Sequence, residues 1–336
     1  MRPSIYHFMM ITLVLAVNAC GPRDRAQTAY ESELSEARAT VFSAPILHKN
    51  YSMGVSAIGF APGGTALAVI ASGNGVELRD LNEDLVQWSA FLTQTASIEQ
   101  VGAVAGGKFV VAGYGGIVAE VNASTGDITS ETTRRDLGNI IISMGISADG
   151  TVLAAGTGHG VLLINADELT VIERFQGALD NVFKVGFSQD GRYVYGLDSY
   201  NLYIWNFRTG ALIQRIDTGY SILKDVAFSS DFTVAAVSTH EYVALYSVDT
   251  GVREHAWRAH EAEVTSMVFT SDFRTLITAS HDDKINAWST STGIIQQSFD
   301  TSVTGGGFRH LTLSPGGRYL AAGYGNDFFL FRTIAP

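Results

Sequence analysis

The sequence predicts an all-β fold, a seven-bladed β-propeller closed by an N-terminal strand. A short strand followed by a turn rich in Gly, Asp or Ser recurs seven times, and the recurrences are 41 to 44 residues apart. That spacing is the length of one four-stranded propeller blade. The composition, with 35 Gly, 18 Phe and 13 Tyr against 6 Pro, suits short strands joined by tight turns. The last repeat contains one strand fewer than the others.

The first twenty residues predict a secretory signal. Arg2 is followed by an apolar run over residues 8–17, and Ala19 precedes Cys20, the only cysteine in the chain. The run is too short to span a membrane stably and has the length of a signal-peptide core. A sole cysteine cannot form a disulfide within the chain, so its position at the end of this run needs another explanation.

Residues 17–20, Val-Asn-Ala-Cys, resemble the lipobox of bacterial lipoproteins, whose cysteine is acylated and becomes the first mature residue. The resemblance implies a lipoprotein signal peptide over residues 1–19 and acyl chains such as palmitate on Cys20. Gly21 in place of Asp implies sorting to the outer membrane of a Gram-negative cell. Val17 and Asn18 depart from the usual pattern, and the alternative is an ordinary secretory signal with an incidental cysteine. Each buried methylene of an acyl chain contributes about 0.8 kcal/mol, enough for a multiply acylated cysteine to hold a soluble domain at a membrane.

The lipidated cysteine and a flexible tether are predicted to occupy residues 20–39, which are mostly polar and rich in Ala, Glu and Arg. The propeller then occupies residues 40–336. Each repeat has an innermost strand, a turn, a second strand, a tight turn, a third strand and a fourth strand. The innermost strands end at the anchor residues Phe60, Val104, Ile146, Phe187, Phe228, Phe269 and Leu313. Third strands run into Thr-Gly turns, where glycine can take a positive φ, at Thr125-Gly126, Thr209-Gly210, Thr250-Gly251 and Thr292-Gly293.

The last repeat lacks a fourth strand, because its third strand, around Phe329 to Phe331, lies close to the end of the sequence. Residues 40–47 precede the first blade and contain Val41, Phe42, Ile46 and Leu47. Pairing this segment with the last repeat would close the ring and cover two exposed sheet edges. We therefore predict a strand over residues 40–47 that completes the seventh blade.

Residues 258–288, RAHEAEVTSMVFTSDFRTLITASHDDKINAW, resemble a repeat of the WD-repeat family. The resemblance covers roughly residues 41–336 and implies that His260, Ser280, Asp282 and Trp288 form that family's structural tetrad. Such a set satisfies its own donors and acceptors inside a packed blade. A Ser-His-Asp catalytic triad is the alternative, but it leaves the tryptophan unexplained. Other repeats hold Ile164, Trp205, Tyr246 and Phe331 at the tryptophan position, and the quinoprotein-like propellers are the main structural rival.

Catalytic motifs are absent from the sequence. It contains no G-x-S-x-G elbow, no H-E-x-x-H, no P-loop and no cysteine cluster for zinc. We therefore predict no catalytic residues, no metal site and no cofactor. The net charge of −11, without a Lys/Arg cluster, opposes binding to a phosphate backbone, so no nucleic-acid partner is expected.

The surface then becomes the candidate functional site. In WD-repeat proteins the turns between second and third strands lie on one face around the central channel, where partners dock. The resemblance places a candidate partner-binding rim on this face, formed by Tyr114, His159, Tyr200, His240, His281, Arg309, His310 and Tyr324. Tyr and Arg are common at interface hot spots. The histidines also permit a hypothesis of pH-dependent binding, which replacing His159, His240 and His281 by alanine would test.

Two classes of function are predicted. The favoured one is a monomeric, non-enzymatic scaffold, anchored by lipid to the bacterial outer membrane, facing the periplasm and binding proteins of an envelope complex. The alternative is a propeller that binds a small ligand or glycan, or hydrolyses one, at the channel mouth. Hydrolysis would require converging carboxylates or a metal set near the axis, whereas the turn positions carry mostly Gly, Tyr and single acids.

Overall fold

The computed structural model describes residues 41–51, 54–60, 67–72, 74–80, 85–93, 98–104, 107–113, 117–133, 141, 143–147, 149–158, 160–178, 180–301, 307–314 and 316–334. Every regular element in these ranges is a β-strand. The predicted signal peptide, Cys20 and the tether lie outside the described residues. Within the described part of the chain, no helix has the length and apolar character needed to cross a membrane.

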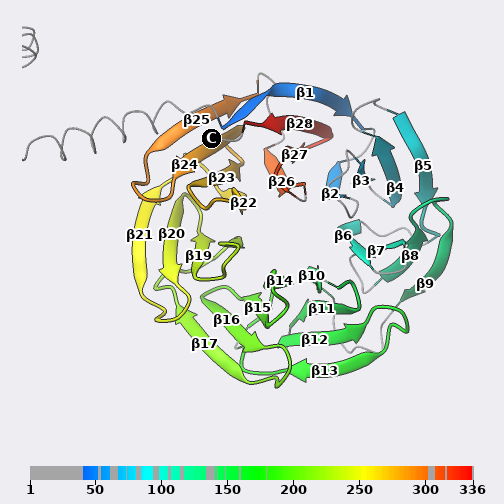
Figure 1. Ribbon diagram of the computed structural model, residues 1–336, viewed down its shortest axis with the longest axis horizontal. Coiled ribbons are helices and arrows are strands. Elements are labelled where there is room, and N and C mark those ends of the chain that lie inside the picture. The colour runs from blue at the N-terminus through cyan, green and yellow to red at the C-terminus, as the bar shows by residue number, and fades with distance from the viewer. Residues whose placement is uncertain are drawn as a thin grey trace, which may run out of the picture.

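The described strands form seven four-stranded antiparallel sheets around a central axis (Figure 1). Six sheets each contain four consecutive strands. The first three are β2 (Val55–Phe60), β3 (Leu67–Ser72), β4 (Gly75–Asp80) and β5 (Leu85–Phe91); β6 (Ile98–Val104), β7 (Lys108–Gly113), β8 (Ile117–Asn122) and β9 (Ile128–Thr133); and β10 (Ser143–Ile146), β11 (Val152–Thr157), β12 (Gly160–Asn165) and β13 (Val171–Phe175).

The next three sheets follow the same order. They are β14 (Lys184–Phe187), β15 (Tyr193–Leu197), β16 (Asn201–Asn206) and β17 (Leu212–Asp217); β18 (Val226–Phe228), β19 (Val234–Ser238), β20 (Tyr242–Ser247) and β21 (Arg253–Arg258); and β22 (Val264–Phe269), β23 (Thr275–Ser280), β24 (Lys284–Ser289) and β25 (Ile295–Asp300). The seventh sheet joins β26 (Phe308–Leu313), β27 (Tyr319–Tyr324) and β28 (Asp327–Thr333) to β1 (Phe42–Asn50).

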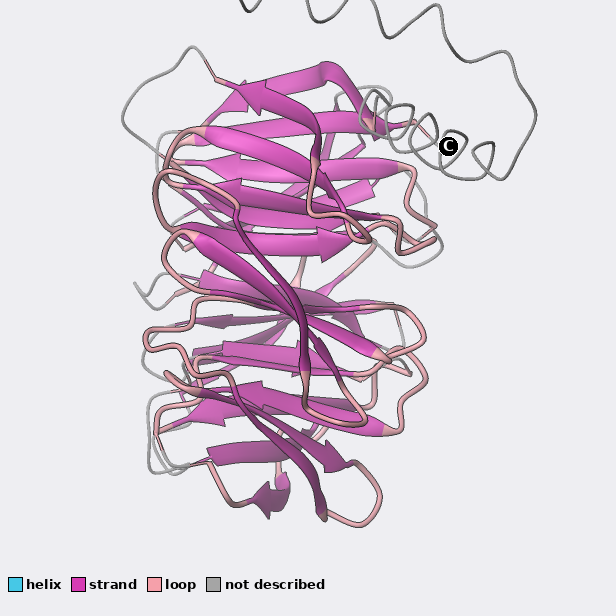
Figure 2. Ribbon diagram, turned by 90° about the vertical axis from the view of Figure 1, so that its left-hand side faces the viewer, coloured by secondary structure: helices cyan, strands magenta, loops and turns pink. Residues whose placement is uncertain are grey.

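In the six blades of consecutive strands the first strand lies nearest the axis and the last forms the perimeter (Figure 1). In the seventh blade β26 lies nearest the axis and β1 forms the perimeter. The connections gather at two opposite faces, as the side view in Figure 2 shows. One face carries the turns after the innermost strands, at Phe187, Phe228 and Phe269, and we call it the anchor face. The other carries the turns between second and third strands, and we call it the rim face.

The core lies between neighbouring blades. The middle strands are almost wholly buried, as in β12 and β27, whose sequences GVLLIN and YLAAGY are nearly continuous apolar runs. Strands covered on both faces are expected to have that pattern. One cluster, for example, packs Leu202 and Ile204 of one blade against Val237 and Tyr246 of the next. Each blade therefore depends on its neighbours for burial.

The Thr-Gly turns have the predicted conformation. Gly126, Gly210, Gly251 and Gly293 have φ values of 67 to 78°. In the corresponding turn between β12 and β13 the residue is Leu169, with φ of 53°. Its side chain is buried in the core of that blade, and this packing offsets the cost of a left-handed residue that has a Cβ.

The ring is closed as predicted by the N-terminal strand. β1 pairs antiparallel with β28, from Phe42 opposite Thr333 to Asn50 opposite Asp327, so the strand runs three residues beyond the predicted segment. As the outermost strand it tolerates Pro45, which could not donate to a further neighbour. Gln297 of β25 fastens β1 to the preceding blade. Its Oε1 accepts from the amides of Val41 and Phe42 at 2.6 and 3.0 Å, and its Nε2 donates to the carbonyl of Phe42 at 2.7 Å.

Candidate functional site

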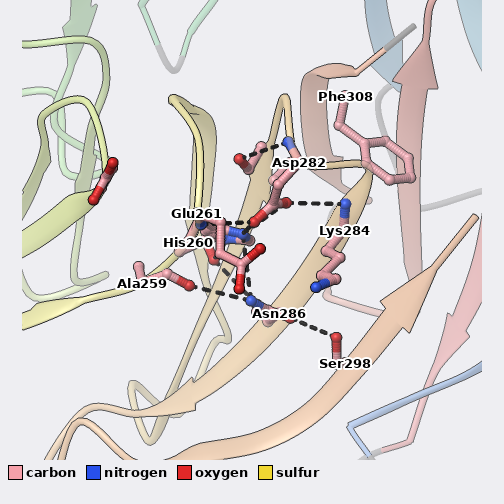
Figure 3. Close-up of polar contacts among 12 residues, drawn as sticks. Ala259, His260, Glu261, Asp282, Lys284, Asn286, Ser298 and Phe308 are labelled. Carbon is pink, nitrogen blue, oxygen red and sulfur yellow. Dashed lines mark hydrogen bonds and ion pairs between the residues drawn. The ribbon is translucent and has the colours of Figure 1, made fainter. Parts of the chain in front are cut away.

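A buried chain of hydrogen bonds ties the sixth blade together (Figure 3). His260 Nδ1 lies 3.0 Å from Asp282 Oδ2, and His260 Nε2 lies 2.7 Å from Thr278 Oγ1. The indole N–H of Trp288 donates to the same Thr278 oxygen at 2.9 Å. Because an ionised carboxylate only accepts, we assign the proton of a neutral His260 to Nδ1, and Nε2 then accepts from the Thr278 hydroxyl.

The tetrad assignment of Ser280 was wrong. The hydroxyl that links His260 to Trp288 belongs to Thr278, while Ser280 Oγ accepts from the backbone N–H of Asp282 at 3.1 Å. Thr278 and Ser280 are two residues apart on β23, so both side chains point to the same face of the strand. Thr278 pairs with Asn286 in mid-strand, whereas Ser280 is the last residue before the turn. The tetrad in the structure is His260, Thr278, Asp282 and Trp288.

The carboxylate of Asp282 is stabilised in its ionised form. Burial raises its pKa, but hydrogen bonds from His260 and from the amides of Glu261 and Lys284 outweigh burial and lower the pKa below its usual value. The side chain of His260 has no exposed surface, and Thr278 is wholly buried. A nucleophilic hydroxyl would have to reach a substrate. The arrangement therefore supports the blade and does not form a catalytic triad.

Two other blades make the same connection with different residues. The indole N–H of Trp205 donates to the carbonyl of Gln176 at 3.0 Å, and the hydroxyl of Tyr246 donates to the carbonyl of Thr218 at 2.8 Å. In each case the third strand is fastened to the segment that leads from the preceding blade, the place that His260 occupies in the sixth blade. A direct bond to the backbone thus replaces the tetrad.

The rim face holds several of the predicted partner-binding residues. Tyr200, His240 and His281 are exposed and occupy equivalent turns in three consecutive blades, and Tyr200 is 52% exposed. Arg309 is also exposed. Tyr114 and His159 lie outside the described residues.

Two rim assignments need correction. Tyr324 is 1% exposed, and its hydroxyl donates to Asp283 Oδ1 at 2.9 Å, so it supports the neighbouring blade and is not available to a partner. His310 is half-buried on β26, the innermost strand of its blade. Burial, followed by the positive charges of Lys184 and Arg309, lowers the pKa of His310 to about 4. This imidazole is therefore neutral near pH 7.

Polar residues along the axis were missed by the sequence analysis. Lys184 Nζ lies 2.8 Å from Asp225 Oδ1, and Asp225 Oδ2 accepts from the amide of Met267 in the next blade at 2.7 Å. Ser266 Oγ likewise accepts from the amide of Leu311 one blade further on, at 3.2 Å. These contacts join the innermost strands of successive blades.

A signal for these axial residues is present in the repeats. Lys184, Asp225, Ser266 and His310 each lie three residues before the anchor of their blade, so aligning the anchors places a polar side chain at the same position in each of the last four repeats. The first two repeats hold Ala57 and Val101 there. Burial also raises the pKa of Tyr195, next to Lys184 and Asp225. Among the described residues no group of three or more His, Cys, Asp or Glu could hold a metal ion.

Comparison with known proteins identifies the repeat. Residues 251–289 match the family described as "WD domain, G-beta repeat", and this range contains His260, Thr278, Asp282 and Trp288. A curated relative, the U3 small nucleolar RNA-associated protein 21 homolog of Schizosaccharomyces pombe (strain 972 / ATCC 24843), is 34% identical over 122 residues. That alignment covers 36% of this chain and 13% of the relative's length.

The seven sheets and the buried tetrad define a β-propeller. The match over residues 251–289 supports the WD40-repeat family within that class. Propellers of this family generally serve as protein-interaction scaffolds and are typically non-enzymatic.

Proposed function

We propose that this protein is a non-enzymatic scaffold that binds partner proteins through its rim face and is held by lipid on Cys20 to a bacterial envelope membrane. The observation that carries the binding part is the exposure of Tyr200, His240 and His281 at equivalent turns of three consecutive blades. Side chains that combine an apolar ring with a polar tip are well suited to protein interfaces. Their recurrence in the turns of successive blades offers a partner several contacts on one face.

The membrane part of the proposal rests on the sequence. Cys20 is the only cysteine, and it ends an apolar run of signal-peptide length. The outer membrane facing the periplasm is the proposed location. The relative's association with U3 small nucleolar RNA is not extended to this chain, because 33 acidic against 22 basic residues give it a charge that opposes a phosphate backbone.

The lipid attachment at Cys20 is tested by comparing the full chain with Cys20→Ala. We expect the full chain to sediment with membranes and to incorporate an alkynyl fatty acid, and the variant to do neither. Proteins that co-purify with each form are then identified by mass spectrometry. A variant that still incorporates the fatty acid and sediments with membranes would rule out Cys20 as the anchor.

The rim is tested by the triple variant Tyr200→Ala, His240→Ala, His281→Ala. We expect it to lose the co-purifying partner. The matched control replaces three exposed apolar residues in or next to the perimeter strands, Ile172→Ala, Leu212→Ala and Val252→Ala, and should retain the partner. Equal retention by both variants would place the binding surface elsewhere.

A further inference from the structure

The turns that follow the innermost strands on the anchor face share one backbone conformation. In two of them the residue with a positive φ is not glycine. In five described blades the fourth turn residue donates its N–H to the first residue's carbonyl and has a φ of 61 to 72°. Three of these positions hold glycine. Phe232 and Phe273 occupy the other two, each with φ of 61°. A left-handed residue with a Cβ costs of order 1 to 3 kcal/mol, and such residues concentrate at functional sites.

Core packing accounts for one of these phenylalanines and not for the other. Phe232 is 6% exposed and stacks on Phe228, with ring centres 4.3 Å apart, and on Tyr193 at 5.3 Å. Phe273 is only half-buried, and the ring contact described for it is an edge-on approach to Phe269 at 6.3 Å. Phe273 instead lines a hollow on the protein surface.

That hollow lies at the axial end of the anchor face and has a volume of about 500 Å³. Its apolar lining comes from the anchors Phe187, Phe228, Phe269 and Leu313 together with Phe232 and Phe273. The remaining lining residues are Tyr195 and small polar or glycine residues, and none carries a charge. Such a lining accepts an uncharged apolar group and excludes an ionised one.

Two narrower grooves continue from the hollow toward the perimeter. Phe232 lines both the hollow and a groove of about 220 Å³, and Phe273 lines both the hollow and a groove of about 240 Å³. The grooves meet at Asp231 and also contain the exposed acids Asp249 and Glu254. Arg192, the cation of the first groove, pairs with Asp190. The grooves therefore favour positive charge, whereas the hollow, which adjoins one groove at Phe232 and the other at Phe273, favours none.

We propose that the hollow and its two grooves bind an extended peptide segment of a partner protein, with one apolar side chain in the hollow and basic side chains in the grooves. This inference rests on the proposed function as a protein-interaction scaffold and adds a second surface, on the face opposite the rim. The left-handed conformation of Phe273 places its ring in the lining of the hollow. An aromatic side chain packed into a pocket at the centre of an interface, with energetically minor contacts around it, is typical of a binding hot spot.

The test uses the full chain in detergent and a fluorescein-labelled nine-residue peptide with a central phenylalanine, glycines beside it and two lysines at each end. Fluorescence anisotropy should show saturable binding. Affinity should fall at least tenfold when the central residue is changed to aspartate, and also when the lysines are changed to glutamates. Phe273→Gly, which restores the glycine of the other turns, should weaken binding at least tenfold while the melting temperature falls by no more than about 3 °C.

The matched control is Ile222→Gly. Ile222 also has a positive φ, of 62°, and is 60% exposed, but its loop joins β17 to β18 on the rim face. This variant should bind the peptide within twofold of the unchanged chain. Equal affinity for all three peptides, or undiminished binding by Phe273→Gly, overturns the proposal. So does a melting-temperature shift caused by cellohexaose without peptide binding, because that result would assign the hollow to a neutral saccharide.

The two proposals fail in different ways. If partners still co-purify with Phe273→Gly and the peptide does not bind the unchanged chain, the anchor-face site is wrong and the scaffold stands. If no partner co-purifies with any form, the scaffold itself is wrong.

Discussion

At the scale of single residues, the sequence identified the kind of network in the sixth blade but not all of its members. His260, Asp282 and Trp288 were found because their spacing in residues 258–288 matches that of a WD-type repeat. The hydroxyl was assigned to Ser280 because two small hydroxyl residues lie on the same face of β23, and composition does not distinguish them. Only the cross-strand register, with Thr278 opposite Asn286, shows that Thr278 and not Ser280 supplies the hydroxyl of the tetrad.

Thr278→Val is expected to lower the free energy of unfolding by about 2 to 3 kcal/mol, because it leaves the buried Trp288 donor and His260 Nε2 without a partner. Urea denaturation measures the change. Thr278→Ser should recover most of the loss. Ser280→Ala should cost about 1 kcal/mol, since it removes one bond to the Asp282 amide. A larger loss of unfolding free energy for Ser280→Ala than for Thr278→Val would instead assign Ser280 to the tetrad.

At the scale of elements, the strand order follows from the repeat length, and the closing strand follows from counting strands in the last repeat. The end of β1 was placed too early because its exposed and half-buried residues alternate through His48 to Asn50 without an apolar signal. Pairing with β28 keeps these residues in the strand. The role of Gln297 was also missed, because nothing in the sequence distinguishes it from the adjacent Gln296 on the same perimeter strand.

Deletion of residues 40–47 is expected to open the ring and lower the melting temperature by more than 10 °C. It removes Phe42, which is wholly buried against Phe331, and exposes the edge of β28. Differential scanning calorimetry measures the shift. A synthetic peptide of residues 40–50, added to the deleted chain, should restore part of the lost stability. An unchanged melting temperature would falsify the closing role of β1.

At the scale of the whole molecule, seven blades meet at an axis that carries buried charge. Lys184, Asp225 and His310 come from three different blades, so their surroundings form only when those blades pack around the axis. The repeat spacing predicts the ring. The charges at its axis depend on which side chain each blade places beside its neighbours, and hence on all the blades together.

Acid is expected to weaken the fold partly through His310. Its pKa is about 4 in the folded chain against 6.5 for a free histidine, so the unfolded chain binds the proton more tightly. The contribution of His310 to the free energy of unfolding should be complete above pH 6.5 and should fall as the pH drops toward 4. His310→Asn should reduce this loss, as measured by urea unfolding at pH 7.0, 5.5 and 4.5. His255→Asn, a change at an exposed site, serves as the control and should leave the slope unaltered.

The pairing of β1 with β28 also means that one strand is synthesised long before its partner. The two strands come from opposite ends of the propeller, and Ile334 still donates to the carbonyl of Val41 at 2.9 Å. At about 5 to 20 residues per second, β1 leaves the ribosome roughly 15 s to 1 min before its partner exists. During that interval β1 has no native neighbour. β28 completes the pairing of β1, and a chain interrupted before residue 327 leaves β1 without its partner.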